Sequence, residues 1–201
     1  MEENVIKKEE IILQPDAAIK IESIEQQINE LKTQMESIAR STAENKISMI
    51  VFSGDLDKAL AAFVIATGAV AMGMDVVMFF TFWGTPLLRD KGKKVDGKDI
   101  MGKMFGAMLP KGVGQVKLSN MNMGGMGTAM MKSLMKKKNV ASLEQMLEMA
   151  GELGVRVFIC EMSMDLMGFQ REEMIAYPDL TFCGVATFLE EAQNSKVQLF
   201  I

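Results

Sequence analysis

An alternation of strand-like and helix-like segments runs through residues 46–201 and constrains the fold more than any other feature. Each strand-like segment is short, apolar and rich in β-branched or aromatic residues, and a glycine or a polar turn separates it from a helical pattern. The predicted strands are 46–53, 74–82, 155–160 and 197–201, with 180–183 as a candidate fifth strand. The predicted helices between them are 56–73, 141–154 and 184–195. The alternation predicts an α/β fold: a single three-layer domain with a roughly five-stranded, mostly parallel sheet.

A membrane helix competes with this interpretation at one point, because only Asp75 is charged between Ala59 and Gly84. Gly73 interrupts the apolar run, and β-branched and aromatic residues follow Asp75, which favours a strand. A helix and a strand that are buried in the interior of an α/β domain are apolar because of this burial, without a membrane. We therefore expect a helix, a turn and a strand here, and no stable membrane insertion.

Residues 1–45 form a separate acidic arm with 5 basic and 10 acidic side chains. Apolar residues in this arm recur at alternating steps of three and four, which predicts an amphipathic helix over about 16–41. These residues are Ile21, Ile24, Ile28, Leu31, Met35 and Ile38. Two interpretations stay open: a coiled coil that assembles a homo-oligomer, or an amphipathic helix that packs on its own domain.

The 201-residue chain contains no histidine, two cysteines, one tryptophan and one tyrosine. The lack of histidine excludes a Ser-His-Asp triad, a Cys-His pair and a His-ligated zinc or haem site. Two cysteines are too few for a four-thiolate zinc site or for an iron–sulfur cluster held by one chain. The net charge of −4 and the few aromatic rings argue against nucleic-acid binding. We expect no metal and no cofactor.

The first residues, MEENVIKKEEI, alternate in charge and lack the apolar run of a secretory signal. Two cysteines in a chain of this length do not form a disulfide scaffold. We therefore expect a cytoplasmic protein with reduced thiols.

A basic, methionine-rich segment lies in the middle of the chain, at about 89–138. It carries 12 basic and 3 acidic side chains, whereas 139–201 carries 3 and 10. We expect its lysines to dock an acidic partner or an anion such as thiosulfate. Its methionines are expected to fill gaps or form an adaptable surface, in preference to binding Cu(I).

Cys160 is the leading candidate for a reactive group. It ends a predicted interior strand and directly precedes EMSMDLMG, a short helical segment. Ligands of open α/β sheets bind beyond the carboxyl ends of the strands, where helix amino-termini present N–H groups that stabilise a thiolate. The alternative is that Cys160 simply fills the strand, because cysteine is often buried.

Cys183 ends the candidate strand 180–183 and precedes Gly184. If this strand neighbours 155–160, both thiols lie at one edge of the sheet, where adjacent strands are about 4.8 Å apart. That spacing would allow a disulfide, provided that the side-chain geometry permits it. A buried apolar cysteine without a chemical role is the competing interpretation.

Several stretches, taken together and in order, resemble the DsrE/DsrF-like family. They are IVFSGDLDKALAAFVIATGAVAMGMDVVMFFTFWG at 50–84, NMNMGGMG at 120–127, VFICEMSMDLMG at 157–168, and GVATFLEEA through VQLFI at 184–201. The resemblance covers 46–201 and is greatest to a Met-rich branch labelled peroxiredoxin-like or oxidoreductase. It implies a five-stranded parallel sheet and a homo-oligomer, and the basic, methionine-rich segment at about 89–138 resembles an insertion of this branch.

The resemblance also implies a function, because the better-understood TusD-type relatives are sulfur carriers. They accept sulfane sulfur on one cysteine and pass it to a small TusA-type partner or to a rhodanese-linked relay. The family's cysteine before the MSMD motif matches Cys160, which is therefore the expected catalytic residue. We expect the helix-start amides around Ser163, Met164 and Asp165 to stabilise an accessible Cys160 thiolate. The family supports no role for Cys183.

Two other functions stay open beside the sulfurtransferase. One is a thiol oxidoreductase or peroxide sensor in which Cys160 becomes a sulfenic acid that Cys183 resolves. The residues before Cys160 lack the Thr of a peroxidatic signature, which weighs against it. The other is a non-catalytic oligomeric scaffold, for which Cys160 would be buried and unreactive.

Overall fold

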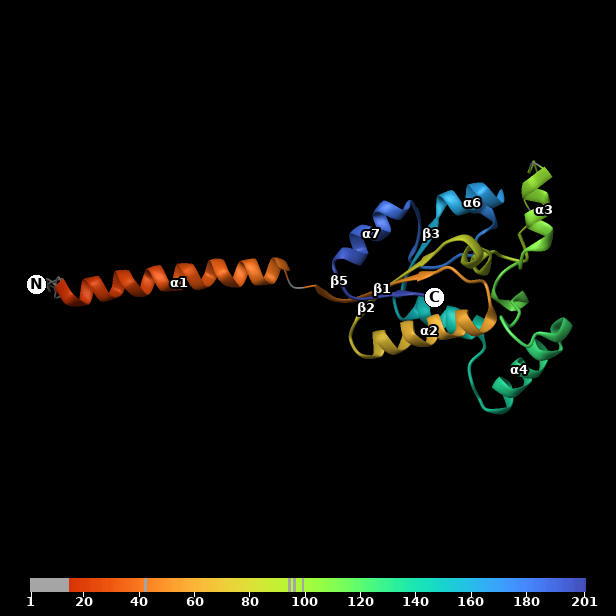
Figure 1. The fold of residues 1–201 in the computed structure, drawn as a ribbon, viewed down its shortest axis with the longest axis horizontal. Helices are drawn as coiled ribbons and strands as arrows, with labels where there is room; N and C mark the ends of the chain where they lie inside the picture. The colour runs from red at the N-terminus through yellow and green to blue at the C-terminus, as the bar shows by residue number, and fades with distance from the viewer. Residues whose placement is uncertain (1–14, 42, 94, 96, 99) are drawn as a thin grey trace, which may run out of the picture. The chain divides into compact units, whose positions relative to one another are not determined.

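The computed structural model describes residues 15–41, 43–93, 95, 97–98 and 100–201. The chain divides into two units, the first ending at Thr42 and the second comprising Ala43–Ile201 (Figure 1). Each unit is described by itself below.

The first unit contains one long helix, α1, which spans Pro15–Ser41. The helix predicted from the apolar spacing is therefore confirmed. Every side chain described in α1, from residue 20 to residue 36, is exposed, including five apolar residues of the heptad seam: Ile21, Ile24, Ile28, Leu31 and Met35. The seam accordingly lies free along one side of this helix within its own unit.

The second unit is built on a parallel sheet, as the strand–helix alternation predicts. In the described part of the chain five strands form it: β1 (Glu44–Val51), β2 (Asp75–Phe80), β3 (Arg156–Cys160), β4 (Leu180–Cys183) and β5 (Ser195–Phe200). The strand order is β4-β3-β2-β1-β5, and every neighbouring pair is parallel. The α/β prediction is confirmed, and 180–183 is the fifth strand.

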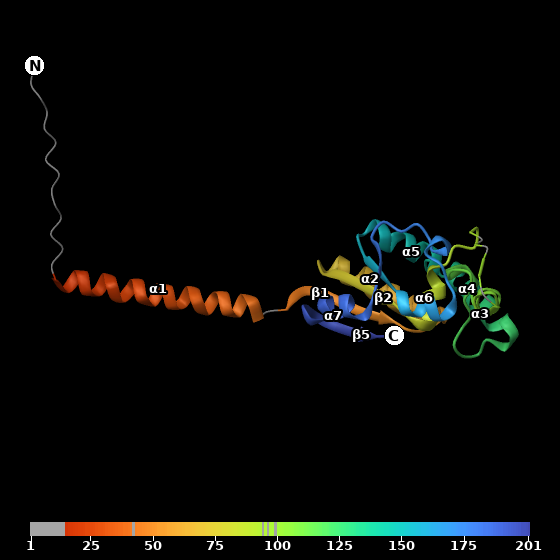
Figure 2. The same cartoon turned by 90° about the horizontal axis from the view of Figure 1, so that it is seen from above.

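Helices cover both faces of this sheet (Figure 1; Figure 2). Helix α2 (Leu56–Ala71) packs beside α5 (Leu143–Glu152) on one face, whereas α6 (Glu161–Met167) and α7 (Val185–Gln193) lie on the opposite side. Most observed element ends differ from the predicted ones by only one or two residues, the usual uncertainty of helix and strand ends.

The apolar stretch 59–84 is divided between a helix and a strand. Helix α2 ends at Ala71, Gly73 takes a left-handed conformation with φ of 74°, and β2 begins at Asp75. Among the described residues, no helix is long and apolar enough to cross a membrane. The small buried residues of α2 allow this helix to approach the sheet closely, which explains its apolar character.

The basic middle segment contains two helices, α3 (Ile100–Met108) and α4 (Met126–Lys137). Short 3₁₀ helices accompany them at Phe82–Leu88, Val113–Gln115, Met123–Gly125 and, after α6, Arg171–Glu173. Most methionines of α3 and α4 are exposed, including Met104, Met108 and Met130. They form a surface in this structure and contribute little to the core.

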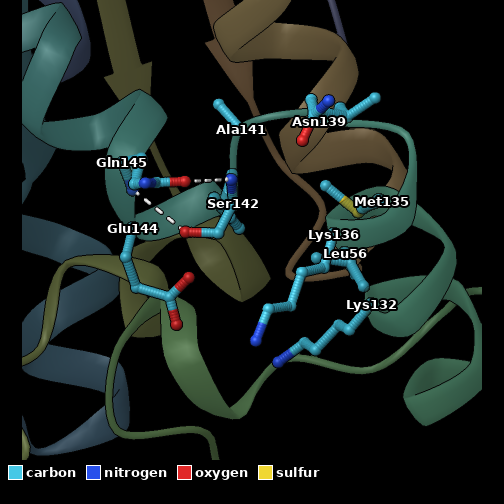
Figure 3. A pocket seen from close by; sticks show the side chains of 11 residues that line it. Leu56, Lys132, Met135, Lys136, Asn139, Ala141, Ser142, Glu144 and Gln145 are labelled. Carbon is cyan, nitrogen blue, oxygen red and sulfur yellow. Dashed lines mark hydrogen bonds between the residues drawn. The ribbon is translucent and has the colours of Figure 1, made fainter.

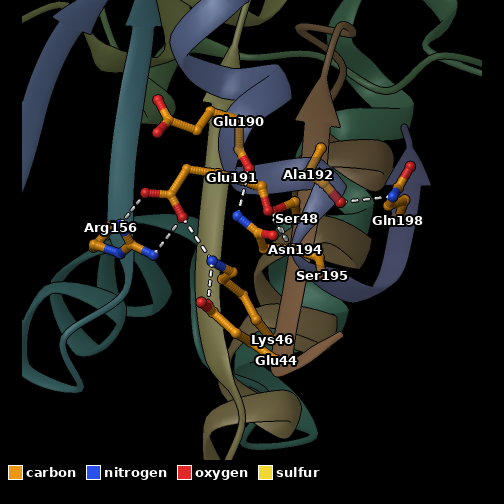
Figure 4. Close-up of polar contacts among 10 residues, drawn as sticks. All are labelled: Glu44, Lys46, Ser48, Arg156, Glu190, Glu191, Ala192, Asn194, Ser195 and Gln198. Carbon is orange, nitrogen blue, oxygen red and sulfur yellow. Dashed lines mark hydrogen bonds and ion pairs between the residues drawn. The ribbon is translucent and has the colours of Figure 1, made fainter. Parts of the chain in front are cut away.

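A polar cluster holds α7 against the sheet at the end remote from the cysteines (Figure 4). Glu191 of α7 accepts hydrogen bonds from Arg156 of β3 at 2.5 and 2.9 Å and from the buried Lys46 of β1 at 2.9 Å. The hydrogen bond from Arg156 is the main cause that lowers the pKa of Glu191 to about 2. Glu191 is therefore ionised at neutral pH and compensates the charge of buried Lys46.

Candidate functional site

The two cysteines end neighbouring parallel strands. In the register of β3 and β4, Cys160 lies directly opposite Cys183. Because side chains alternate between the faces of a sheet, residues opposite each other in a parallel pair point to the same face. Both thiols therefore lie side by side on the face that α7 covers.

Apolar side chains surround this thiol pair. Cys160 is 3% exposed and Cys183 is 6% exposed, and neither forms a disulfide. They belong to a buried cluster with Val77, Phe79, Phe158, Phe188 and Ala192. The ring of Phe79 stacks on Phe188 of α7 at 4.9 Å between centroids, which closes the cluster over the sheet.

Burial has a direct consequence for Cys183. It is the main cause that raises the pKa of this thiol to about 11, and the charges of Cys160 and Glu161 contribute in the same direction. Cys183 is therefore a protonated thiol at neutral pH. Of the two cysteines, Cys160 is the one adjacent to the start of α6.

The expectation of an accessible Cys160 thiolate is wrong for this conformation. The reason is that alternation along β3 directs Cys160, like Phe158, toward α7, which covers that face. Sequence position locates the strand end, but it does not reveal which face a later helix will cover.

The three residues expected to support Cys160 have different environments. Ser163 is buried; its hydroxyl shares a hydrogen bond of 2.9 Å with that of Thr81 and accepts one of 3.0 Å from the Phe82 N–H. Met164 is buried in the main core, and Asp165 is exposed. Ser163 thus ties α6 to the end of β2, and Met164 anchors the same helix in the core.

Arg171 is a residue near the thiols that the sequence did not single out. Its guanidinium pairs with the carboxylate of Glu161, which directly follows Cys160, and lies 5.0 Å from the ring centroid of Phe182 on β4. Glu161 carries the charge that would oppose a thiolate at Cys160, and Arg171 offsets it. Arg171 follows Glu161 by ten positions, and the nine residues between them gave no local signal of this pairing.

A cavity of about 850 Å³ lies away from the cysteines, between α4 and the start of α5 (Figure 3). Lys132 and Lys136 point into it from α4, and Glu144 faces it from α5. Ser142 caps α5 by accepting a hydrogen bond of 3.3 Å from the Gln145 N–H. The basic segment thus brings two lysines to this hollow, but the carboxylate of Glu144 reduces its positive charge.

Another cavity, of about 600 Å³, lies beyond the carboxyl ends of β1 and β2. Its walls include Phe52, Trp83 and Met108, together with Lys58 and Lys117. Among the described residues, no three or more cysteine, aspartate or glutamate side chains are grouped so that they could hold a metal ion.

The described domain is thus a parallel α/β protein with a pair of thiols at the carboxyl ends of two neighbouring strands. The model of the DsrE/DsrF/DrsH-like family matches residues 43–200, and the chain belongs to this family, as the resemblance of its motifs predicts. Residues 1–42 lie outside the match.

Two relatives match the chain along nearly their whole lengths. The chain is 45% identical over 156 residues to "Uncharacterized protein YrkE" of Bacillus subtilis (strain 168), and the aligned region covers 78% of this chain and 96% of the relative. It is 35% identical over 159 residues to "Sulfur carrier protein DsrE2" of Allochromatium vinosum, which covers 79% of this chain and 99% of that relative.

Proposed function

We propose that this protein is a sulfur carrier that holds sulfane sulfur as a persulfide on Cys160 and passes it to the thiol of a partner protein. By this transfer it acts as a sulfurtransferase. The observation that carries the proposal is a cysteine at the carboxyl end of an interior parallel strand, in a domain 35% identical to a sulfur carrier. The chemistry needs one thiolate nucleophile and a sulfane donor.

The burial of Cys160 defines how this carrier works. A donor reaches the thiol only when the segment over the strand ends, at the starts of α6 and α7, moves aside. Met162, Gly184 and Val185 at these starts are exposed to solvent, which supports an opening at this place. Local opening of this kind is common at functional sites. Once closed, the same cover protects a persulfide from water and from unrelated thiols.

The test compares two variants that each keep one cysteine. We expect Cys183→Ala to gain sulfur atoms after treatment with polysulfide, and Cys160→Ser to gain none, because Cys160 alone accepts sulfur. Intact mass spectrometry of the reduced and treated proteins measures the gain, and a reductant should remove it. Circular dichroism of both variants confirms that each is folded.

Sulfur gained by Cys160→Ser would contradict the assignment to Cys160. If neither variant gains sulfur while the unmodified protein forms a disulfide with dilute peroxide, the thiol-oxidoreductase function is correct. The register pairing of Cys160 with Cys183 is the observation that favours this second candidate. If no reagent modifies either cysteine, the protein is a scaffold with buried thiols.

The proposal includes the chemical class of the sulfur donor and of the sulfur acceptor. The donor is a sulfane-bearing anion, which the lysines of the basic segment attract. The acceptor is a small sulfur-relay protein of the TusA type or a rhodanese. We place this relay in the cytoplasm, where thiols are kept reduced.

We further propose that α1 assembles the protein into a homo-oligomer through its heptad seam. The seam residues from Ile21 to Met35 are exposed, and a second copy offers the same spacing of apolar side chains. In a parallel coiled coil, the residue that precedes one core position of a helix faces the residue that follows the next core position in the other helix. Lys20 of one copy then meets Glu25 of the other, which is an attractive pairing.

Replacing Ile24 and Ile28 by Asp should therefore dissociate the oligomer, because charges in the seam cannot be buried without partners. Light scattering measures the mass of the full chain and of the variant. Exchanging two exposed polar residues of α1, Gln26 and Asn29, for Ala provides the control and should leave the mass unchanged. A full chain that is monomeric at micromolar concentration would contradict the proposal.

A further inference from the structure

The placement of Cys183 gives this protein a chemistry beyond holding sulfur. Cys183 and Cys160 are opposite one another in adjacent parallel strands and share one apolar cluster. Adjacent strands are about 4.8 Å apart, within the range of about 4.4–6.8 Å that a disulfide requires between its Cα atoms. The two side chains therefore lie on the same face, and the spacing of their strands is compatible with a disulfide between them.

We propose that Cys183 is a resolving cysteine, which expels the sulfur bound to Cys160 as hydrosulfide and leaves a Cys160–Cys183 disulfide. The inference rests on the proposed persulfide at Cys160. It turns a carrier that can only hand sulfur to a partner into one that can also release it as sulfide.

The atoms and electrons of this step balance within the protein. The Cys183 proton moves to the terminal sulfur of the ionised persulfide, and the Cys183 sulfur attacks Sγ of Cys160. The bond between Sγ and the terminal sulfur breaks, and hydrosulfide leaves with the electron pair. The sulfane sulfur is reduced by two electrons, and the two cysteines are oxidised to a disulfide. A dithiol reductant then restores both thiols.

The surroundings favour the internal thiol over an external one. The apolar cluster and α7 exclude solvent from the pair, so an outside thiol must wait for the cover to open. Cys183 is already in place, and a reaction partner held in position has a high effective concentration. The raised pKa of Cys183 supports this role, because its thiol arrives protonated and supplies the proton that hydrosulfide takes away.

The experiment uses the full chain, reduced, freed of reductant, and treated briefly with polysulfide without oxygen. The unmodified protein should end two hydrogen atoms lighter than its reduced form and should release sulfide that a bimane reagent traps. Cys183→Ala should instead stay one or more sulfur atoms heavier. We expect its persulfide to last on the order of tenfold longer or more. Cys183→Ser is measured as a second variant, so that a folding defect of one substitution at this position does not decide the result.

Thr181→Ala serves as the matched control, because Thr181 is exposed on the same strand and both thiols remain. It should release sulfide like the unmodified protein. Equal persulfide lifetimes with and without Cys183, and no sulfide release, would overturn the inference and leave the sulfur-carrier proposal standing. Failure of Cys183→Ala to take up any sulfur would overturn both.

Discussion

Replacing Glu173 by alanine is expected to lower the free energy of unfolding by about 3–5 kcal/mol, the usual cost of removing one partner of a buried ion pair. Glu173 is buried, accepts a hydrogen bond of 3.2 Å from the buried Arg89, and pairs with Lys98. Although burial alone would raise its pKa, the Lys98 hydrogen bond and the two positive charges lower the pKa overall. Without this carboxylate, two cations stay buried and uncompensated.

The cluster also explains how the basic segment is held on the domain. Arg89 donates to the carbonyls of Gly106 at 3.3 Å and Pro110 at 3.2 Å, and its guanidinium lies 4.5 Å from the ring centroid of Phe169. Glu173 therefore fixes Arg89, and Arg89 fixes the last turn of α3 and the chain directly after it. Urea denaturation of Glu173→Ala measures the expected loss of stability.

The adjacent, exposed Glu172 offers the matched control for this substitution. Glu172→Ala should change the free energy of unfolding by no more than about 0.5 kcal/mol, because surface substitutions away from special features have small effects. A loss below about 1 kcal/mol for Glu173→Ala would show that Arg89 and Lys98 find water or other partners without it.

Replacing Phe63 by alanine should cost about 3–5 kcal/mol, through lost apolar burial and the cavity that remains. Phe63 of α2 is 0% exposed, and its ring centroid lies 6.2 Å from that of Phe80 on β2. The neighbours of Phe63 on the same face of α2, Ala59 and Ala66, are small and cannot fill the space. Thermal or urea unfolding measures the effect.

Val64 is the control for this position, since it follows Phe63 in α2 but is 53% exposed. Val64→Ala should be neutral within about 0.5–1 kcal/mol, because lost surface contacts are offset by the higher helix propensity of alanine. If Phe63→Ala and Val64→Ala had equal effects, the packing of α2 on the sheet would differ from that described here.

Phe63 belongs to the part of the structure that local sequence could predict. Burial of a helix face or of a strand requires apolar residues at regular spacing, so the pattern of α2 and β2 is visible without coordinates. The same logic applies to α1, where the steps of three and four predicted the helix. Strand 180–183 was less certain, because four residues are too few to show a period.

Glu173 and Arg171 belong to the part that sequence could not predict. Glu173 pairs with Arg89, which is 84 residues away, and Arg171 pairs with Glu161, which precedes it by ten positions. Most charged residues lie on the surface, so neither sequence position distinguishes a buried carboxylate from a solvated one. The burial of Cys160 is of the same kind, since it depends on where α7 packs.

The helices, the strands and the parallel α/β class of this protein could be predicted from its amino-acid sequence, because the spacing of apolar residues is a local property. The position of Cys160 at the end of an interior strand could be predicted in the same way. The three-dimensional structure was needed to show that Cys183 lies opposite Cys160, that both thiols are covered, and that Glu173 holds two buried cations. The physical reason is that strand register and helix packing bring together residues whose separation along the chain carries no signal.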